Sequence, residues 1–262
     1  MIHARTVAQR AAAAGLSRIW SNTGTVVFTA AFYLMVTAVL AALWSAAAAV
    51  NDGHIVGYSA SALIWYIAAS EAATIALPQR LIEEIGQDVK GGAIEIEMLR
   101  PASVLLVRLS TQFGAMIARL SICAACGVVF SLIFAGRPGD FRALALAGPA
   151  VVLALVLSLV AQHLFAAISF WMRDATATWF LYQKLIFVLG GMLLPLEVLP
   201  QTMETIARWL PFSAMAYIPA RLASGHFEPH LLLIQLGWIA AIGAAATITF
   251  NAGQRRLLEA VS

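Results

Sequence analysis

Residues 25–50 read TVVFTAAFYLMVTAVLAALWSAAAAV, and no residue between Arg18 and Asp52 is charged. About 20 consecutive apolar residues are enough for a helix to cross the hydrocarbon core of a bilayer. The whole chain shares this character, since 61% of its 262 residues are hydrophobic and 11% are charged, whereas a soluble domain is about half apolar and a quarter charged. The sequence therefore predicts an all-α integral membrane protein that forms a single transmembrane domain, residues 1–262.

Charges and prolines divide the rest of the chain into five further apolar stretches, which makes six predicted spans. The second runs from about Val56 to Leu77 and stops at Pro78, since proline ends a helix. The third belongs to a long helix that ends near Gly136 and enters the bilayer near Arg119, whose long stem can reach back to the interface. The last three spans cover about 143–172, 179–196 and 230–250, and a short tail follows.

Three segments do not fit a span. Residues 1–22 lack the compact apolar core and cleavage site of a signal peptide. They predict an amphipathic helix on the membrane surface, with Ile2, Leu16, Ile19 and Trp20 available to the lipid side. Residues 79–102 are too charged to enter lipid, so they predict a cytoplasmic loop or surface helix. Residues 197–228 are punctuated by prolines and only moderately polar, which predicts a re-entrant helical hairpin in the outer leaflet.

The distribution of basic residues predicts the orientation. Six spans place both termini on one side, and cytoplasmic segments carry an excess of Lys and Arg. With the termini inside, the inner segments hold ten basic residues and the outer segments four, while two lie near the membrane. We therefore expect a multi-pass protein of the bacterial cytoplasmic membrane with both termini in the cytoplasm. The net charge of +3 follows from this bias, and we expect no nucleic-acid partner.

No motif for nucleotide binding or catalysis is visible. The chain has no G-x-x-x-x-G-K-[ST] phosphate loop and neither G-x-S-x-G nor H-E-x-x-H. Cys123 and Cys126 lie one turn apart in an apolar run without a nearby histidine, which favours ordinary buried cysteines over a metal or redox site. His163 lies inside a predicted span and is interpreted as a packing residue. We expect no metal, no cofactor and no enzymatic activity in this chain, and a membrane-embedded enzyme is the weaker class.

The polar segment after the second span is the most informative. Residues 83–101, EEIGQDVKGGAIEIEMLRP, combine acidic residues, a Gly-Gly break and a Leu-Arg-Pro ending. Residues 190–225 hold a Gly before a proline-containing hairpin, then Leu-Pro-Phe, then a Pro before a Gly. With the six-span layout, these stretches resemble the ABC-2 type exporter permeases, in particular a branch of about this length often encoded in pairs beside one ATPase. The doubled Gly91–Gly92, Arg119 and Lys184 depart from the family pattern.

This resemblance implies a permease subunit of an ATP-driven exporter that works by alternating access. Its partners would be two ABC ATPase subunits, which would bind the ATP and Mg, and a second permease that is identical or related. The substrate would be an amphipathic or hydrophobic small molecule or a lipid-like compound. The segment after the second span would form a coupling helix that docks on the ATPase, and the alternative is a solvated face with no partner. The predicted contact residues are Glu83, Glu84, Asp88, Lys90 and Arg100.

Glu71 is an acid inside the second predicted span. An ionisable residue there is costly, so it usually faces a cavity or a basic partner. Glu71 could line the translocation path near the cytoplasmic side and favour cationic substrates. It could instead pair with Arg119 or Lys184, and the residues leave both possibilities open. It also supports an alternative function, in which the chain is an ion-coupled secondary transporter that uses Glu71.

Aromatic residues supply the other candidates for the path. Trp65, Tyr66 and Phe180 are predicted to wall a route for an apolar substrate. Trp179 and Tyr182 lie near the start of the fifth predicted span, where such residues usually act as anchors at the membrane interface. We interpret these two as anchors.

Overall fold

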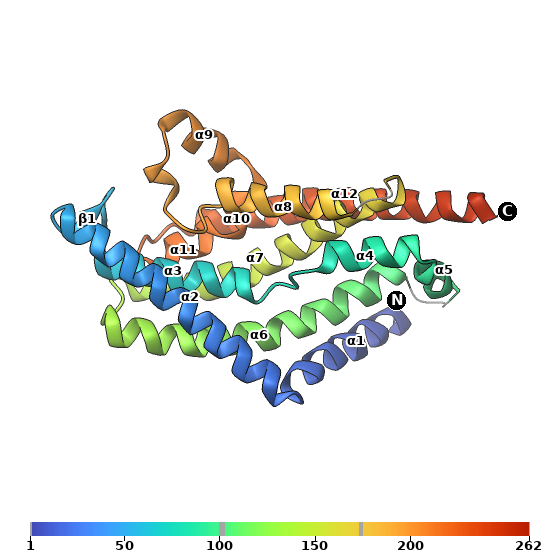
Figure 1. The fold of residues 1–262 in the computed structure, drawn as a ribbon, viewed down its shortest axis with the longest axis horizontal. Helices are drawn as coiled ribbons and strands as arrows, with labels where there is room; N and C mark the ends of the chain where they lie inside the picture. The colour runs from blue at the N-terminus through green and yellow to red at the C-terminus, as the bar shows by residue number, and fades with distance from the viewer. Residues whose placement is uncertain (1, 100–102, 173–174, 262) are drawn as a thin grey trace.

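The computed structural model describes residues 2–99, 103–172 and 175–261, and it is a bundle of helices with one short two-stranded turn (Figure 1). Within these residues, four helices are long and apolar enough to cross a membrane. They are α2 (Thr23–Val50), α6 (Val104–Phe134), α7 (Phe141–Ala167), which the 3-10 turn η1 (Ile168–Phe170) extends, and α12 (His230–Val261). Two shorter helices, α3 (Ala60–Ile75) and α8 (Thr176–Leu189), lie where the second and fifth spans were predicted. The helical membrane fold is confirmed, and the count of six spans stays a prediction.

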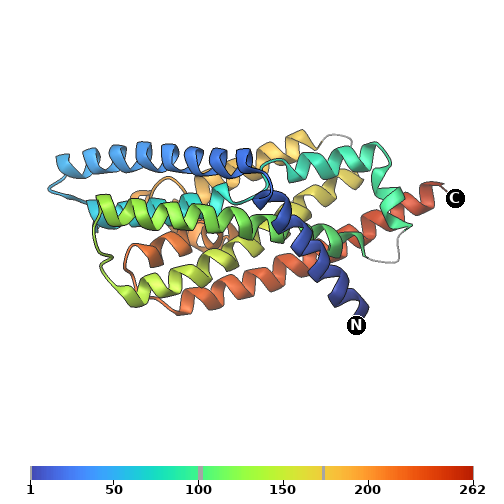
Figure 2. The ribbon, with the colours of Figure 1, turned by 90° about the horizontal axis from the view of Figure 1, so that it is seen from below.

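The long helices run along one axis, and the short elements gather at its two ends (Figures 1 and 2). We call one end the terminal end, because both termini lie toward it together with α4 (Leu81–Lys90) and α5 (Ala93–Met98). We call the other the hairpin end, where β1 (His54–Ile55) pairs antiparallel with β2 (Tyr58–Ser59). The half near the hairpin end also holds η2 (Leu196–Val198), α9 (Gln201–Trp209), α10 (Pro211–Met215) and α11 (Tyr217–Ala223).

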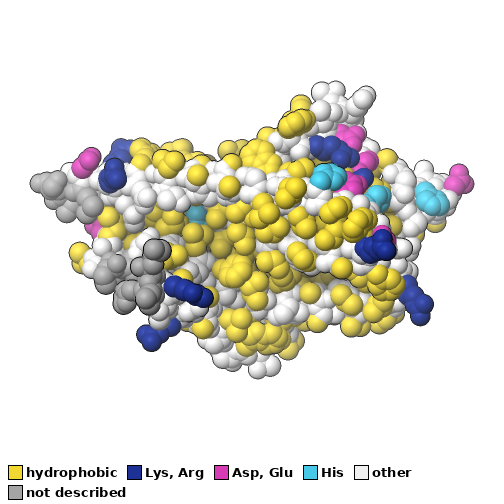
Figure 3. Space-filling model, turned by 180° about the vertical axis from the view of Figure 1, so that it is seen from behind, with side chains coloured by type: hydrophobic (Ala, Val, Ile, Leu, Met, Phe, Trp, Pro, Cys, Tyr) yellow, Lys and Arg dark blue, Asp and Glu magenta, His cyan; other side chains and the backbone are white. Residues whose placement is uncertain are grey.

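A broad apolar band surrounds the middle of the molecule. Figure 3 shows charged side chains toward the two ends and a wide area of hydrophobic side chains between them. Large apolar residues of the long helices are exposed there, among them Phe28 on α2, Ile133 on α6 and Leu233 on α12. Soluble monomers rarely expose apolar areas of this extent, so the band is the part of the surface that lipid covers.

α7 is the central helix of the bundle. It contacts α3, α4, α8, α11 and α12, and Leu155 and Leu157 are fully buried against these neighbours. Ala147, Ala150 and Ala154 are also buried on α7, and small residues of this kind let helix backbones approach closely in a membrane protein. α7 therefore serves as the support against which the shorter helices pack.

α1 (Ile2–Trp20) crosses α6 and packs directly on it (Figure 2). A Cβ atom built on Gly15 would lie 1.9 Å from the carbonyl oxygen of Thr111, and one built on Gly114 would lie 1.9 Å from that of Ala12. Only glycine leaves room for this backbone-to-backbone approach. Ile19 is buried in the same contact, so the prediction that it faces lipid was wrong.

Two helix ends differ from the sequence prediction. The second span was predicted from about Val56, but residues 56–59 belong to the β1–β2 turn, in which Val56 and Gly57 have positive φ angles. α3 begins only after Ser59, whose side chain accepts a hydrogen bond from the backbone N–H of Ala62 and caps the helix. The predicted tail after residue 250 continues α12 as a helix to Val261, and most of its residues are good helix formers although they are too polar for lipid.

Candidate functional site

α4 is an amphipathic helix that docks on the bundle by one face. Leu81, Ile82 and Ile85 are fully buried, and the helix contacts α7, α8 and η1. A Cβ atom on Gly86 would lie 2.2 Å from the Cβ atom of Ala175, so the glycine permits close contact at this point. Glu84 and Lys90 are exposed on the opposite face of α4, away from the bundle.

α5 continues this unit after a sharp turn. Gly92 has a φ angle of 76°, a conformation that glycine adopts without strain, and it separates the two helices. α5 buries Ile94 but leaves Ile96 67% exposed, and Leu99, just beyond the helix, is 85% exposed. Because residues three apart lie on the same face of a helix, Ile96 and Leu99 form an apolar surface on the charged terminal end. We call α4 and α5 together the α4–α5 unit.

Arg108 on α6 holds the α4–α5 unit in place. Its Nη2 atom donates to Asp88 Oδ2 of α4 at 2.6 Å, and its Nε atom donates to Glu97 Oε2 of α5 at 2.8 Å. The Arg108 side chain is only 15% exposed, so both bonds are charge-assisted contacts shielded from water on one side. One guanidinium therefore joins three helices.

The five predicted contact residues lie in different environments. Glu84 and Lys90 are exposed on the outer face of α4, where a partner can reach them. Glu83 is half-buried and lies 3.7 Å from Arg80. Asp88 is bound to Arg108, so its charge is used inside the chain. Arg100 lies outside the described residues.

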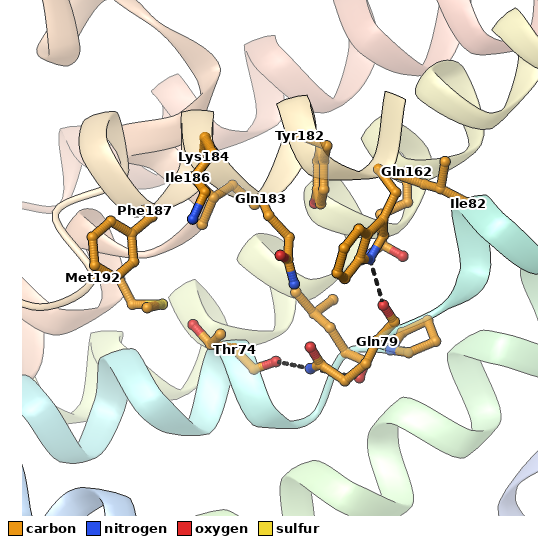
Figure 4. Close-up of a pocket in the computed structure, with 13 residues that line it drawn as sticks. Thr74, Gln79, Ile82, Gln162, Tyr182, Gln183, Lys184, Ile186, Phe187 and Met192 are labelled. Atoms are coloured by element: carbon orange, nitrogen blue, oxygen red, sulfur yellow. Dashed lines mark hydrogen bonds between the residues drawn. The ribbon is translucent and has the colours of Figure 1, made fainter. Parts of the chain in front are cut away.

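A cavity of about 240 Å³ lies between α3, α7 and α8 (Figure 4). We call it the α3–α8 cavity. Side chains from α8 and from the end of α3 face one another across it. Its apolar wall includes Leu77, Ile82, Ile186, Phe187 and Met192, and its polar wall includes Thr74, Gln79, Gln162, Gln183 and Lys184. Ile82 belongs to α4, so the α4–α5 unit forms part of this wall.

Hydrogen bonds fix the mouth of the α3–α8 cavity. Trp179 Nε1 donates to the carbonyl oxygen of Gln79 at 2.9 Å, and Gln79 Nε2 donates to the carbonyl oxygen of Thr74 at 3.2 Å. Tyr182 is buried, and its hydroxyl donates to the carbonyl oxygen of Ser158 at 3.3 Å. Both aromatic residues thus belong to the cavity wall. The burial of Tyr182 shows that its interpretation as an interface anchor was wrong, whereas Trp179 is half-buried at the start of α8 and its role as an anchor stays a prediction.

Among the described residues, Lys184 is the single cation that lines this cavity. Its ammonium nitrogen lies 5.0 Å from the centre of the Phe180 ring and 5.9 Å from that of Phe187. Among the residues that the structure describes, no carboxylate forms an ion pair with Lys184, and no Asp or Glu lines the cavity. The contacts with two aromatic faces are cation–π interactions, which stabilise the charge only in part.

The four predicted path residues do not meet in one cavity. Phe180 is exposed beneath Lys184. Trp65 lines a separate cavity of about 250 Å³ between α2, α3, α6 and α7. Tyr66 is fully buried, and its hydroxyl donates to the carbonyl oxygen of Gly191 at 2.5 Å, which is a structural contact. Phe180, Trp65 and Tyr66 therefore lie in three different environments.

Glu71 is buried on α3. Its Oε1 atom has no hydrogen-bond partner among the described residues, and neither Arg119 nor Lys184 lies within ion-pair distance of it in this part of the chain. The ion pair of Glu71 with Arg119 or Lys184 is thus not formed.

His163 binds within its own helix, with Nδ1 2.8 Å from the carbonyl oxygen of Leu159. The described residues contain no cluster of metal ligands.

The sequence did not point to the glutamines. Gln79, Gln162 and Gln183 come from three segments, and each lies within or beside an apolar stretch. An uncharged amide in such a stretch is the signal that would have found them, since polar side chains in spans seek a partner or a cavity.

A second polar cluster lies at the hairpin end, and we call it the hairpin-end cluster. Glu197 Oε1 accepts hydrogen bonds from Tyr217 at 2.5 Å, from Arg208 at 3.0 Å and from Arg221. Tyr58, which precedes α3, donates to the same oxygen at 3.4 Å. Burial and the Glu197 charge raise the pKa of Tyr58 to about 12, so its hydroxyl keeps its proton. The cluster fastens residues 196–223 to the β1–β2 turn.

His226 packs beside the hairpin-end cluster. Its ring lies 4.9 Å from the ring of Tyr58, and its Nδ1 atom is 3.0 Å from Ser224 Oγ. Burial and the positive charge of Arg221 lower the pKa of the His226 imidazole, which therefore stays neutral more readily than a free histidine.

Comparison with known proteins gives one family. A family model described as ABC-2 family transporter protein matches residues 33–260, which includes every helix except α1 and the start of α2. A comparison with curated proteins finds no match.

Proposed function

The chain belongs to the ABC-2 family of transporter proteins, and we propose that it is the permease of an ATP-driven exporter. It is a membrane protein and the permease component of an ABC transporter, not the ATPase. We propose further that it moves an amphipathic or hydrophobic small molecule or a lipid-like substrate out of the cytoplasm by alternating access. Its partners in this proposal are two ABC ATPase subunits, which hold the ATP and Mg, and a second permease, identical or related.

The observation that carries this proposal is the α4–α5 unit. It docks on the bundle by its apolar face, and Arg108 clamps it to α6. It leaves Glu84, Lys90 and Ile96 exposed at the terminal end. A rigid element with a mixed apolar and charged outer face is suited to bind a partner, because apolar area supplies affinity and charges supply orientation.

We also propose six spans with the terminal end in the cytoplasm of a bacterium. α3 has 16 residues and α8 has 14, so at 1.5 Å per residue they measure about 24 and 21 Å, less than the hydrocarbon thickness of about 30 Å. Both contact α7, and this packing against protein makes a span shorter than the bilayer more tolerable. The excess of basic residues in the segments of the terminal end supports the orientation.

The test is co-purification of an ABC ATPase with tagged permease from native membranes in mild detergent. Ile96→Gln replaces an exposed apolar side chain on α5. Ile206→Gln is the matched control, because Ile206 is a 53% exposed isoleucine on the short helix α9 near the other end. Loss of a buried isoleucine contact weakens binding by about tenfold or more.

We expect the original chain and Ile206→Gln to retain an ATPase, identified by its phosphate-loop peptide, and Ile96→Gln to lose it. Equal retention by both variants would show that the ATPase binds elsewhere. If no ATPase accompanies the original chain and transport continues after ATP depletion, the exporter proposal is wrong and the ion-coupled transporter that uses Glu71 replaces it.

A further inference from the structure

The α3–α8 cavity combines an apolar wall with a cation, Lys184, that forms no ion pair within the described part of the chain. Leu77, Ile186 and Met192 supply apolar surface, while Gln162 and Gln183 supply amide groups that can donate hydrogen bonds. The wall contains lysine and glutamine but, among the described residues, no carboxylate. This composition is complementary to a molecule that is apolar at one end and negatively charged at the other.

Lys184 gives the cavity wall a positive charge. A charged ammonium in a membrane-embedded helix is costly and normally has a partner. The rings of Phe180 and Phe187 approach it at 5.0 and 5.9 Å, but no carboxylate among the described residues pairs with it. An anionic group in the cavity would satisfy the ammonium, and a cationic group would be repelled.

The size of the cavity limits what it encloses. Pockets that enclose a drug-sized ligand measure about 300–1,000 Å³, and this one measures about 240 Å³. Lys184 and Phe187 both line the cavity and are exposed on α8, so the cavity opens at the surface of the bundle. It therefore holds a headgroup and the beginning of a chain, and the rest of the chain lies outside.

We propose that the α3–α8 cavity binds an amphiphile with an anionic headgroup, such as a phosphate or carboxylate, and that Lys184 selects the charge. This inference rests on the proposed function, since it names the substrate class of the permease. It also differs from the expectation that Glu71 favours cationic substrates, because Glu71 does not line this cavity.

The experiment measures binding to the purified full-length chain in lipid nanodiscs. The probes are dodecyl phosphate and dodecyltrimethylammonium, which share an alkyl chain and differ in the sign of the headgroup. We expect dodecyl phosphate to bind about tenfold more tightly, the factor that one charge-assisted hydrogen bond supplies. Lys184→Gln should abolish this preference, and Lys184→Arg should keep it.

Arg142→Gln is the matched control, since Arg142 is an exposed cation at the start of α7 and does not line the cavity. It should leave the preference unchanged. A lysophospholipid and inorganic phosphate, added as competitors, distinguish a lipid headgroup from a free anion: displacement by the lipid alone identifies an amphiphile, and displacement by phosphate alone overturns the proposal.

Equal binding of the two probes, or a preference that survives Lys184→Gln, also overturns it. The measurement needs no ATPase, so a negative result beside normal ATPase retention refutes the substrate class and leaves the exporter proposal standing.

Discussion

The crossing of α1 and α6 allows a quantitative prediction for Gly114→Ala. The added Cβ atom would lie 1.9 Å from the carbonyl oxygen of Ala12, whereas ordinary contact begins at 3.4 Å. The two backbones must separate by up to about 1.5 Å, the difference between these distances. Overpacking of this kind costs about 1–3 kcal/mol, and the higher helix propensity of alanine offsets about 1 kcal/mol.

Gly237→Ala provides the matched control. Gly237 lies in α12, and a Cβ atom there meets nothing within 4 Å. Both variants gain the same helix propensity, so the difference between them isolates the packing cost. For a chain of this size, about 1–3 kcal/mol lowers Tm by roughly 2–12 °C.

The assay is thermal unfolding of the purified proteins in one detergent, followed by limited trypsin digestion. Arg10 and Arg18 are exposed on α1, so cleavage at both should become faster in Gly114→Ala when α1 separates from α6. Equal Tm values and equal cleavage rates for Gly114→Ala and Gly237→Ala would refute the close crossing.

Two further predictions concern the two ends of the molecule. Arg108→Gln removes two ion pairs of a 15% exposed side chain and should destabilise the protein by about 1–3 kcal/mol, measured as a lower Tm. Arg80→Gln, at a 79% exposed side chain, should change Tm little, and equal effects of the two variants would contradict the clamp. In the folded protein the pKa of His226 lies below its ordinary value of 6.5, so the unfolded chain binds a proton at this imidazole more readily than the folded chain does. The stability that the neutral imidazole contributes is therefore fully present above pH 6.5 and is lost as the pH falls from there through the folded pKa. Tm should therefore fall more steeply for the original chain than for His226→Gln as pH is lowered below about 6.5, and parallel curves would refute this role.

The long helices could be predicted because lipid imposes one strong requirement, a continuous apolar run. The run at 25–50 became α2 (Thr23–Val50), and the run at 143–172 became α7 with η1. Hydropathy does not reveal where an apolar segment turns. The β1–β2 turn shortens the second predicted span, and Gly57 is the visible sign of it, because its positive φ suits a turn.

The candidate site was predictable in part. The charged segment after α3 could be recognised as a surface element, but its partners could not. Asp88 pairs with Arg108, 20 residues later, and this contact requires α6 to return beside α4. The cavity was missed for a similar reason, since Gln79, Gln162 and Gln183 meet only after α3, α7 and α8 pack together.

The position of α4 connects the two parts of the site physically. Its outer face carries Glu84 and Lys90, the proposed ATPase contacts, and its buried Ile82 lines the α3–α8 cavity. Gln79, just before α4, binds Trp179 on the opposite wall. A displacement of α4 by the ATPase would therefore change the cavity wall directly, with no chain of intermediate residues to carry the coupling. Arg108 of α6 binds both α4 and α5 through one guanidinium, so such a displacement would move α4 and α5 together and would either carry α6 with them or break these ion pairs.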